Sequence, residues 1–437
     1  SSSYGIAVHL PKAIKQKLPE GTDISLYYFH GNNETPTVRY AIDGAQLPNE
    51  KGKTDDYSIQ LDGLNGRATL RLTYFKTIDT SAPASYGQPL GNGVGWLIQS
   101  LPAWTLSMAS YGIAASQLGA DGLKAVGADG NSWYWNWGTV PANQAVIAQI
   151  ASVLQNQFAA AYPQSWWDSY NNNVDMAAVK AGDWLHVVKG TNQPLAWNIY
   201  GTSTIHGQYP IIDQDVQSKG FELEATIRPL KNWELTFNGS SASAEQTKLG
   251  QHTIDQMDAM ANLWLDTPLG MTAEWGSFTS YGTMKRQFIS TLYGPYLTQR
   301  ALTGTQQPEW SKLKFNIITN YTFDRGVAKG LNVGGAYRWE DRRILGYGVS
   351  QQQIFGGTYW IADVNQPLWS PTESHFDMWI GYEHKLTAKL NWKIQLNLTN
   401  VGEKVHLVPI SVEPDGSTAQ ARIANGQEWA LTNTISF

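Results

Sequence analysis

Residues 390–399 read Leu-Asn-Trp-Lys-Ile-Gln-Leu-Asn-Leu-Thr, with apolar and polar side chains in strict alternation. Successive side chains of a β-strand point to opposite faces, so this pattern predicts a strand with one apolar and one polar face. The same alternation recurs elsewhere in the chain. We predict eleven strands in all, over residues 4–10, 24–28, 57–61, 70–74, 221–227, 233–237, 313–323, 331–339, 376–382, 390–399 and 429–437.

The connections between these strands alternate between short and long. The short ones are rich in Gly, Pro, Asn and Asp, as turns are, and span residues 11–21, 62–66, 229–232, 324–330 and 387–389. The long ones span residues 30–54, 80–217, 249–309, 345–372 and 403–426. Because short and long connections alternate strictly, all long loops lie at one end of the strands. This arrangement is typical of outer-membrane barrels with periplasmic turns and extracellular loops.

The composition excludes several classes of protein. Only 15% of the residues are charged and 12% are aromatic, with 19 Trp and 21 Tyr, so the chain is not disordered. The 31 basic and 36 acidic residues give a net charge of -5, which provides no basic surface for nucleic acid. The sequence contains no run of about 18 apolar residues, so we predict no transmembrane helix. It also contains no cysteine, which excludes disulfides and thiolate metal sites. The chain begins Ser1-Ser2-Ser3-Tyr4, with no initiator Met and none of the basic or apolar regions of a signal peptide, so we expect a mature or truncated product.

These features predict an all-β fold, an antiparallel transmembrane β-barrel with long, partly helical extracellular loops. In such a barrel the apolar face contacts outer-membrane lipid, and aromatic residues gather where hydrocarbon meets water. Aromatic residues do lie near the ends of the predicted strands, at Tyr74, Trp233, Trp310, Trp339, Tyr382, Trp392 and Trp429. A soluble β-sandwich also alternates apolar and polar residues, but its loops would be of comparable length at both ends.

The barrel portion is expected to extend over residues 1–437, with large extracellular insertions at 80–217 and 249–309. Within the first insertion, Ala142–Tyr162 has Val146, Ile150, Val153, Leu154 and Phe158 at helical spacing, which predicts an amphipathic helix. The nine Trp of this insertion also allow a small inserted domain with its own core.

The penultimate strand ends in Asn397-Leu398-Thr399-Asn400, and the last strand ends in an aromatic residue, Phe437. This C-terminal hairpin resembles that of TonB-dependent outer-membrane receptors. Gly220–Glu224, followed by Pro229–Leu235, is similar to the barrel hairpins of the same family. The resemblance covers essentially the whole chain, and it implies that Phe437 is an outer-membrane assembly signal.

The resemblance implies that a complete receptor contains a TonB box, a globular plug and 22 strands. Neither box nor plug is found here, and the eleven strands correspond to the C-terminal half of such a barrel. We therefore expect the plug and the remaining N-terminal strands on a separate polypeptide or on a missing N-terminal part, divided within an extracellular loop. An odd strand count with a periplasmic C-terminus places Ser1 on the extracellular side.

Candidate catalytic and metal sites are weak. The sequence has no G-x-S-x-G, no P-loop and no zinc-binding histidine spacing, so we predict neither enzymatic activity nor a cofactor or bound metal. Glu222 and Glu224 share one face of a strand and are interpreted as a solvated lumen wall rather than a catalytic pair. Asp55-Asp56 and Asp341–Arg343 are interpreted as charged strand ends at the outer rim, with ion capture as the alternative.

The candidate ligand-binding residues are aromatic and amide side chains of the longest loop. Large aromatic faces can stack on a polar organic ligand while amides fix its orientation. The set is Asn131, Trp133, Trp135, Asn136, Trp137, Trp166 and Trp167. Packing of the loop itself is the alternative role for these indoles, and residues 251–265 and 351–360 are further candidates at the same mouth.

The resemblance implies energised uptake of a scarce substrate through a plug-gated barrel, driven by the TonB system. The substrates implied are siderophores, vitamins such as cobalamin, and oligosaccharides or other polar organic nutrients. The first alternative is a barrel scaffold for surface adhesion or assembly without transport. A passive porin is a further alternative, disfavoured because the long loops would have to leave an open pore.

Overall fold

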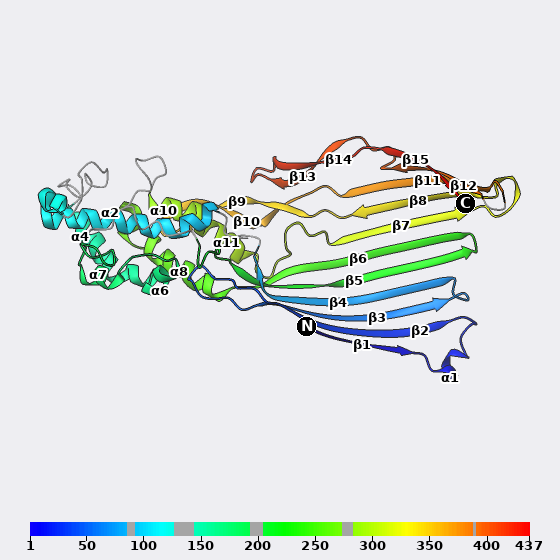
Figure 1. Cartoon of the computed structure of the whole chain (residues 1–437), viewed down its shortest axis with the longest axis horizontal. Helices are drawn as coiled ribbons and strands as arrows, with labels where there is room; N and C mark the ends of the chain where they lie inside the picture. The colour runs from blue at the N-terminus through cyan, green and yellow to red at the C-terminus, as the bar shows by residue number, and fades with distance from the viewer. Residues whose placement is uncertain (85–91, 126–143, 193–203, 273–282, 388–389) are drawn as a thin grey trace.

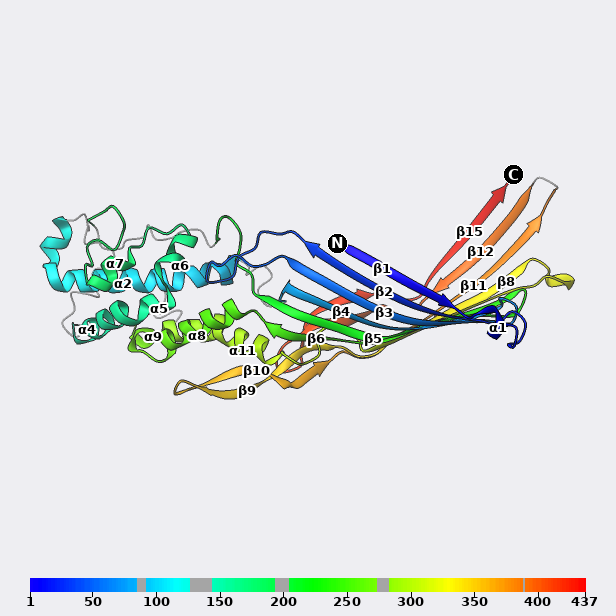
Figure 2. The same cartoon turned by 90° about the horizontal axis from the view of Figure 1, so that it is seen from below.

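The chain forms a long antiparallel sheet with a group of helices beyond one end of its strands (Figures 1 and 2). The structure is a computed structural model that describes residues 1–84, 92–125, 144–192, 204–272, 283–387 and 390–437. The short connections lie at the opposite end of the strands, which we call the turn end, and the helices define the cap end.

The prediction of eleven strands in one antiparallel sheet is confirmed. Neighbouring strands are also neighbours in chain order, apart from two hairpins outside the sheet. The strands are β1 (Ser2–His9), β2 (Asp23–Thr35), β3 (Glu50–Gly63), β4 (Ala68–Pro83), β5 (Asp213–Leu230), β6 (Trp233–Leu249), β7 (Leu313–Thr322), β8 (Leu331–Glu340), β11 (Glu373–Lys385), β12 (Asn391–Thr399) and β15 (Glu428–Ser436). The sheet is open, because within the described residues β1 pairs only with β2 and β15 only with β12.

Several strands extend beyond their predicted ends toward the cap. The β2–β3 ladder continues to the pair Thr35 and Glu50, so the predicted loop 30–54 shrinks to residues 36–49. Asp55 and Asp56 therefore lie inside β3, and their interpretation as a strand end was wrong. The reason is that backbone hydrogen bonding continues where the apolar alternation has stopped, and the alternation was the only signal available.

The helices of both large insertions form one helical cap. They are α2 (Asn92–Ala125), α4 (Gln144–Val153), η2 (Leu154–Phe158), α5 (Ala159–Ala161), α6 (Gln164–Ser169), α7 (Met176–Ala181), α8 (Gln251–Leu265), α9 (Pro268–Thr272), α10 (Met284–Gln287), η4 (Phe288–Tyr293) and α11 (Gly294–Ala301). The helix predicted within 142–162 is confirmed by α4, η2 and α5, with Ile150, Leu154 and Phe158 buried.

The two insertions share a single apolar core. Trp264 of α8 donates its indole N–H to the Tyr162 hydroxyl at 2.8 Å, and Gln256 donates to the Ala161 carbonyl at 2.7 Å. Helix α2 was not predicted, because its residues from Ile98 to Ala115 are buried on nearly every side and so show no single apolar stripe. None of the described helices has the length and apolar character needed to cross a membrane.

Two further long connections contain β-hairpins. Residues 345–372 contribute most of β9 (Ile344–Ile354) and β10 (Gly357–Trp369), and residues 403–426 contain β13 (His406–Val412) and β14 (Thr418–Ala424). The Lys285 ammonium donates to the Phe355 carbonyl at 2.9 Å, which joins the first hairpin to the cap. At the turn end, α1 (Lys12–Lys15) and the 3-10 turn η5 (Gly326–Ala328) occupy two of the short connections.

Candidate functional site on the inner face of the sheet

The alternation gives the sheet two chemically different faces. We call the apolar one the outer face and the polar one the inner face. Large apolar side chains of the outer face remain exposed although they lie in a regular sheet, among them Tyr4, Ile6, Val8, Leu26, Tyr57, Ile59, Leu61, Leu70, Leu72, Phe221, Ile227, Leu313, Ile317, Val333, Phe376, Met378, Ile380, Leu431 and Ile435. Soluble proteins rarely expose an apolar surface this extensive.

Aromatic side chains border the outer face at both ends. Toward the cap, Tyr28, Tyr57, Tyr74 and Phe221 form a row across β2 to β5, with successive ring centroids 5.0, 6.4 and 5.2 Å apart. We call this row the cap-side girdle. Toward the turn end, Tyr382 and Trp392 lie 6.5 Å apart, and Tyr321 and Phe323 lie 4.8 Å apart. On β11 the residues Phe376 and Tyr382 are separated by about 20 Å of strand, which is compatible with the apolar band of a membrane barrel.

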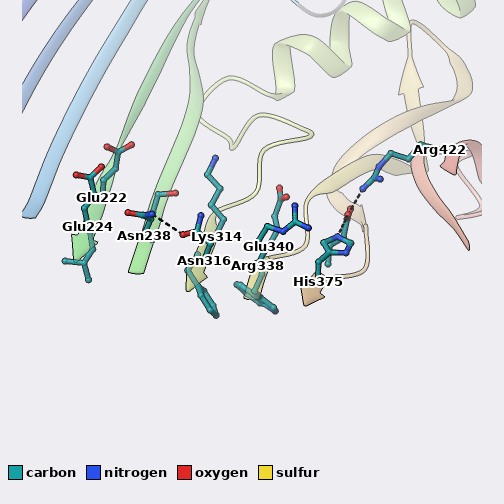
Figure 3. Close-up of a pocket in the computed structure, with 15 residues that line it drawn as sticks. Glu222, Glu224, Asn238, Lys314, Asn316, Arg338, Glu340, His375 and Arg422 are labelled. Atoms are coloured by element: carbon teal, nitrogen blue, oxygen red, sulfur yellow. Dashed lines mark hydrogen bonds and ion pairs between the residues drawn. The ribbon is translucent and has the colours of Figure 1, made fainter. Parts of the chain in front are cut away.

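The inner face contains a polar hollow of about 520 Å³, which we call the inner-face hollow (Figure 3). Its polar side chains form two rows across β5, β6, β7, β8 and β11, each set by the pairing register. The first row is Glu222, Ser240, Lys314, Glu340 and Glu373, and the second is Glu224, Asn238, Asn316, Arg338 and His375. Arg422 of β14 approaches from the side.

Ion pairs concentrate at one end of this hollow. Glu373 accepts hydrogen bonds from Arg343 at 3.1 Å and from Arg422 at 2.5 Å. Arg338 lies 3.1 Å from Asp377. The imidazole Nδ1 of His375 lies 3.0 Å from a carboxylate oxygen of Glu403, in the connection before β13. These contacts attach the β13–β14 hairpin to the inner face and satisfy most of the charges there.

Three charged groups lie at the other end, of which Glu224 faces Arg71 of β4 in register. Glu222, Glu224 and Lys314 make no side-chain hydrogen bond or ion pair within the part of the chain that the structure describes. The carboxylates lie on β5 and the ammonium on β7, two inter-strand spacings away, or about 10 Å. Between them, Asn238 donates to Asn316 at 3.2 Å. The hollow therefore presents opposite charges separated by amides, an arrangement suited to a polar ligand with complementary groups.

The structure places Trp166 and Trp167 in the core of the helical cap. Both side chains are 0% exposed. Trp166 donates its indole N–H to the Ile42 carbonyl at 3.2 Å, and Trp167 donates to the Tyr162 carbonyl at 3.1 Å. Both indoles therefore pack the core of the loop, which is the alternative to ligand contact, and they have no exposed surface for a ligand.

The other predicted contacts, Asn131, Trp133, Trp135, Asn136 and Trp137, lie outside the described residues. Of the two further candidate segments, residues 251–265 form α8 of the cap and residues 351–360 belong to the β9–β10 hairpin. Phe437 follows β15 at the turn end and is 99% exposed. Its role as an assembly signal stays a prediction.

Burial and ion pairing shift pKa values within the cap. Burial raises the pKa of Tyr296 to about 12. A hydrogen bond from Lys189 at 2.9 Å lowers the pKa of Asp168 below its usual value. The described residues contain no cluster of three His, Asp or Glu side chains able to hold a metal ion.

Glu222 and Glu224 were noted in the sequence as a wall, but Lys314, Asn316, Arg338 and His375 were not recognised as belonging with them. All of them are polar residues of the alternating strands, so the sequence pattern assigns each to the inner face. The pattern does not give the register, because only the pairing of β5 to β11 shows which polar residues are level with one another.

Comparison with known proteins finds similarity at the level of structure alone. No family model matches the sequence and no curated protein matches it. The ferripyoverdine receptor of the outer membrane of Pseudomonas aeruginosa matches with a TM-score of 0.43 and 10% identity, covering 99% of this chain and 32% of that one. The ferric preacinetobactin receptor BauA of Acinetobacter baumannii matches with a TM-score of 0.41 and 9% identity, covering 99% and 36%.

The ferric yersiniabactin uptake receptor FyuA of Yersinia pestis has a TM-score of 0.39 at 11% identity, with 99% of this chain and 36% of that chain covered. This chain thus spans about a third of the length of the structures it matches.

Proposed function

We propose that this chain forms part of the wall of an outer-membrane receptor that takes up a scarce substrate with energy from the TonB system. The main support is the sheet with two opposite faces, one apolar, exposed and bordered by aromatic girdles, the other polar and charged. Apolar residues outside and polar residues inside are what a barrel wall needs between lipid and a hydrated lumen. In this proposal the cap and the two hairpins are extracellular, and the turn end is periplasmic.

The open edges of the sheet specify the partner that such a barrel requires. Every backbone group within the bilayer must be hydrogen-bonded, so β1 and β15 each need another strand. In an antiparallel sheet of eleven strands the first and last run in the same direction. A partner with an odd number of strands closes the barrel with antiparallel pairing at both seams, and eleven more would make 22. We propose that it also supplies the plug, as a separate polypeptide or an N-terminal part.

The substrate proposed for the inner-face hollow is a polar organic molecule. A siderophore, a vitamin and an oligosaccharide all belong to this class, and the unpartnered Glu222, Glu224 and Lys314 favour one with charged groups of both signs. The candidate residues Asn131, Trp133, Trp135, Asn136 and Trp137 remain proposed as a first contact at the mouth.

Two measurements test this proposal. First, the protein is extracted from isolated outer membranes, and its mobility on gels is compared before and after heating, because folded barrels migrate differently from unfolded ones. Intact masses of what copurifies then identify the partner strands. Second, uptake of labelled siderophores, cobalamin and oligosaccharides is measured in cells with and without the protein, and with and without TonB. Uptake of at least one substrate that requires both supports the proposal, whereas a soluble protein, or unchanged uptake throughout, contradicts it.

The helical cap favours a second candidate function, a surface adhesion or assembly module. The cap has its own apolar core and so is built as a folded unit rather than as loose loops. If deletion of the protein changes cell contacts or surface assembly while uptake of every tested nutrient persists, the second function replaces the first.

A further inference from the structure

Two phenylalanines lie on either side of a carboxylate at one level of the inner face. The pairing register aligns Gly5, Phe29, Asp56, Phe75 and Gly220 on the neighbouring strands β1 to β5. All five belong to the inner face, because the residues before and after each of them in sequence belong to the outer face. Directly opposed side chains of neighbouring strands begin about 5 Å apart, so each phenyl ring lies beside the carboxylate.

These two rings depart from the polar character of the inner face. The Phe29 side chain is 42% exposed. Glycine follows each ring on the same level, Gly5 beside Phe29 and Gly220 beside Phe75, so no side chain covers the rings from there. Gly31 leaves a third side open, since a Cβ atom at this position would lie 3.1 Å from the Phe29 ring. A hydrated wall gains nothing from an exposed phenylalanine, so this exposure favours contact with a ligand.

The carboxylate between the rings is free. Asp56 makes no side-chain hydrogen bond or ion pair with any residue that the structure describes. The basic residue nearby, Arg71, places its guanidinium over the Tyr27 ring at 5.2 Å and donates to the Ser58 hydroxyl at 3.4 Å. Arg71 also faces Glu224 in register. Its charge is thus directed to Tyr27, Ser58 and Glu224, and Asp56 remains open.

These side chains line a second hollow of the inner face, of about 220 Å³, which we call the aromatic hollow. Its charged lining residues are Asp56, Glu222, Glu224 and Arg71, so its net charge is negative. Glu222 and Glu224 also line the inner-face hollow, and one ligand can therefore extend into both. Pockets that hold a whole drug-sized ligand measure about 300–1,000 Å³, so the aromatic hollow fits one group of a larger molecule.

We propose that the aromatic hollow binds an organic cation, an ammonium or guanidinium group of the transported substrate, at the Asp56 carboxylate between Phe29 and Phe75. An organic cation is attracted both to a carboxylate and to the face of an aromatic ring. A hard metal ion instead requires about six oxygen ligands, which aromatic walls do not supply. The inference deepens the proposed function, on which it rests because the inner face must line a lumen, and it names an amine-bearing substrate.

The test uses the full chain with its copurifying partner in a non-ionic detergent. The probes are butylamine, which is protonated at neutral pH, and 1-butanol as a neutral molecule of similar size, each titrated by ligand-observed NMR. We expect butylamine to bind at least tenfold more tightly than butanol. Asp56→Asn keeps the size of the side chain but removes its charge, and is expected to weaken butylamine binding about tenfold.

Two further variants separate the contribution of the ring from that of charge in general. Phe29→Leu keeps an apolar side chain but removes the aromatic face, and we expect butylamine binding to weaken about threefold while butanol binding stays the same. Asp324→Asn removes a carboxylate at the turn end and is expected to bind as the wild type does. Mobility before and after heating shows which variants are folded.

Equal binding of butylamine and butanol, or wild-type affinity in folded Asp56→Asn, would overturn the cation site. If butylamine does not bind the wild type and Asp56→Asn releases the copurifying partner, the hollow holds a basic side chain of that partner, and the inference is also rejected. Failure of amine binding in a wild type that is folded in the outer membrane rejects this inference alone. A wild type absent from the outer membrane rejects the proposed function as well.

Discussion

The helical cap buries large aromatic side chains of a kind that the sheet leaves exposed. In the cap, Trp166, Trp167 and Trp264 are 0% exposed and lie in a core. In the sheet, Trp429 is 72% exposed on the outer face. A chain surrounded by water alone would have no reason to treat tryptophan so differently in its two regions. The difference supports the proposal that the two regions have different surroundings, with water around the cap and lipid around the sheet.

The largest expected effect comes from opening a cavity in the cap. Trp166→Ala removes a fully buried indole together with its hydrogen bond to Ile42, and we expect it to lower the free energy of unfolding of the cap by about 3–5 kcal/mol. Trp429→Ala is the matched change on the sheet and is expected to cost less than about 1 kcal/mol in the cap. Denaturant titration followed by limited proteolysis of the cap measures both. Equal losses would break the distinction between the two regions.

A charge on the outer face is expected to have the next largest effect. Ile380→Arg places a cation in the middle of the apolar band of β11 and should destabilise the membrane-inserted sheet by about 2–4 kcal/mol. Gln395→Arg makes the same addition on the inner face of β12, next to Gly381, where water is available. The folded fraction after extraction, read by gel mobility before and after heating, is the measurement. If both variants fold equally well, the outer face does not contact lipid.

Removing charge from the inner-face hollow is expected to affect binding rather than folding. E222Q/E224Q keeps the size of both side chains but removes two unpartnered carboxylates, so we expect affinity for a substrate with a cationic group to fall about tenfold. E20Q/E413Q removes the same charge elsewhere and is the control. Substrate binding to the extracted protein is measured for each. Unchanged affinity in E222Q/E224Q would assign these carboxylates to the wall of the barrel alone.

The smallest expected effect concerns pH and the cap. Lys189 lowers the pKa of Asp168, so the pair stabilises the cap above the unfolded pKa of an aspartate, about 3.9, and this stability is lost as the pH falls through the lower folded pKa. Asp168 is 54% exposed, so solvent screening limits the contribution to less than about 1 kcal/mol. Asp168→Asn should remove it near pH 7 and make little difference near pH 2. A loss that stayed constant over this range would point to a cause other than charge.

The strands and their two faces could be predicted from the sequence because a period of two is a local property. Residues 390–399 and 376–382 needed no distant partner to be recognised, and all eleven strands appear in the sheet. The helix within 142–162 was predictable for the same reason, since its apolar residues recur at helical spacing on one side. Helix α2 was not, because a helix buried on nearly every side has no period to detect.

The candidate site was predictable only in part. Glu222 and Glu224 were recognised as a polar wall. That Glu222 is level with Lys314 and Glu224 with Asn316 follows only from the pairing of β5, β6 and β7, which the sequence pattern does not give. Trp166 and Trp167 were predicted to contact a ligand and are packed in a core, because the second insertion and the loop around Ile42 close over them. Such contacts join residues more than 100 positions apart, and no local pattern encodes them.

The sequence by itself determined the class of the sheet, the number of its strands and the chemistry of each face, since these depend only on the order of neighbouring side chains. Only the tertiary structure decided that both large insertions share one core and that polar residues of five strands surround one hollow. The physical reason is that register and packing are set by the free energy of contacts between distant segments, which come into being only when the whole chain folds.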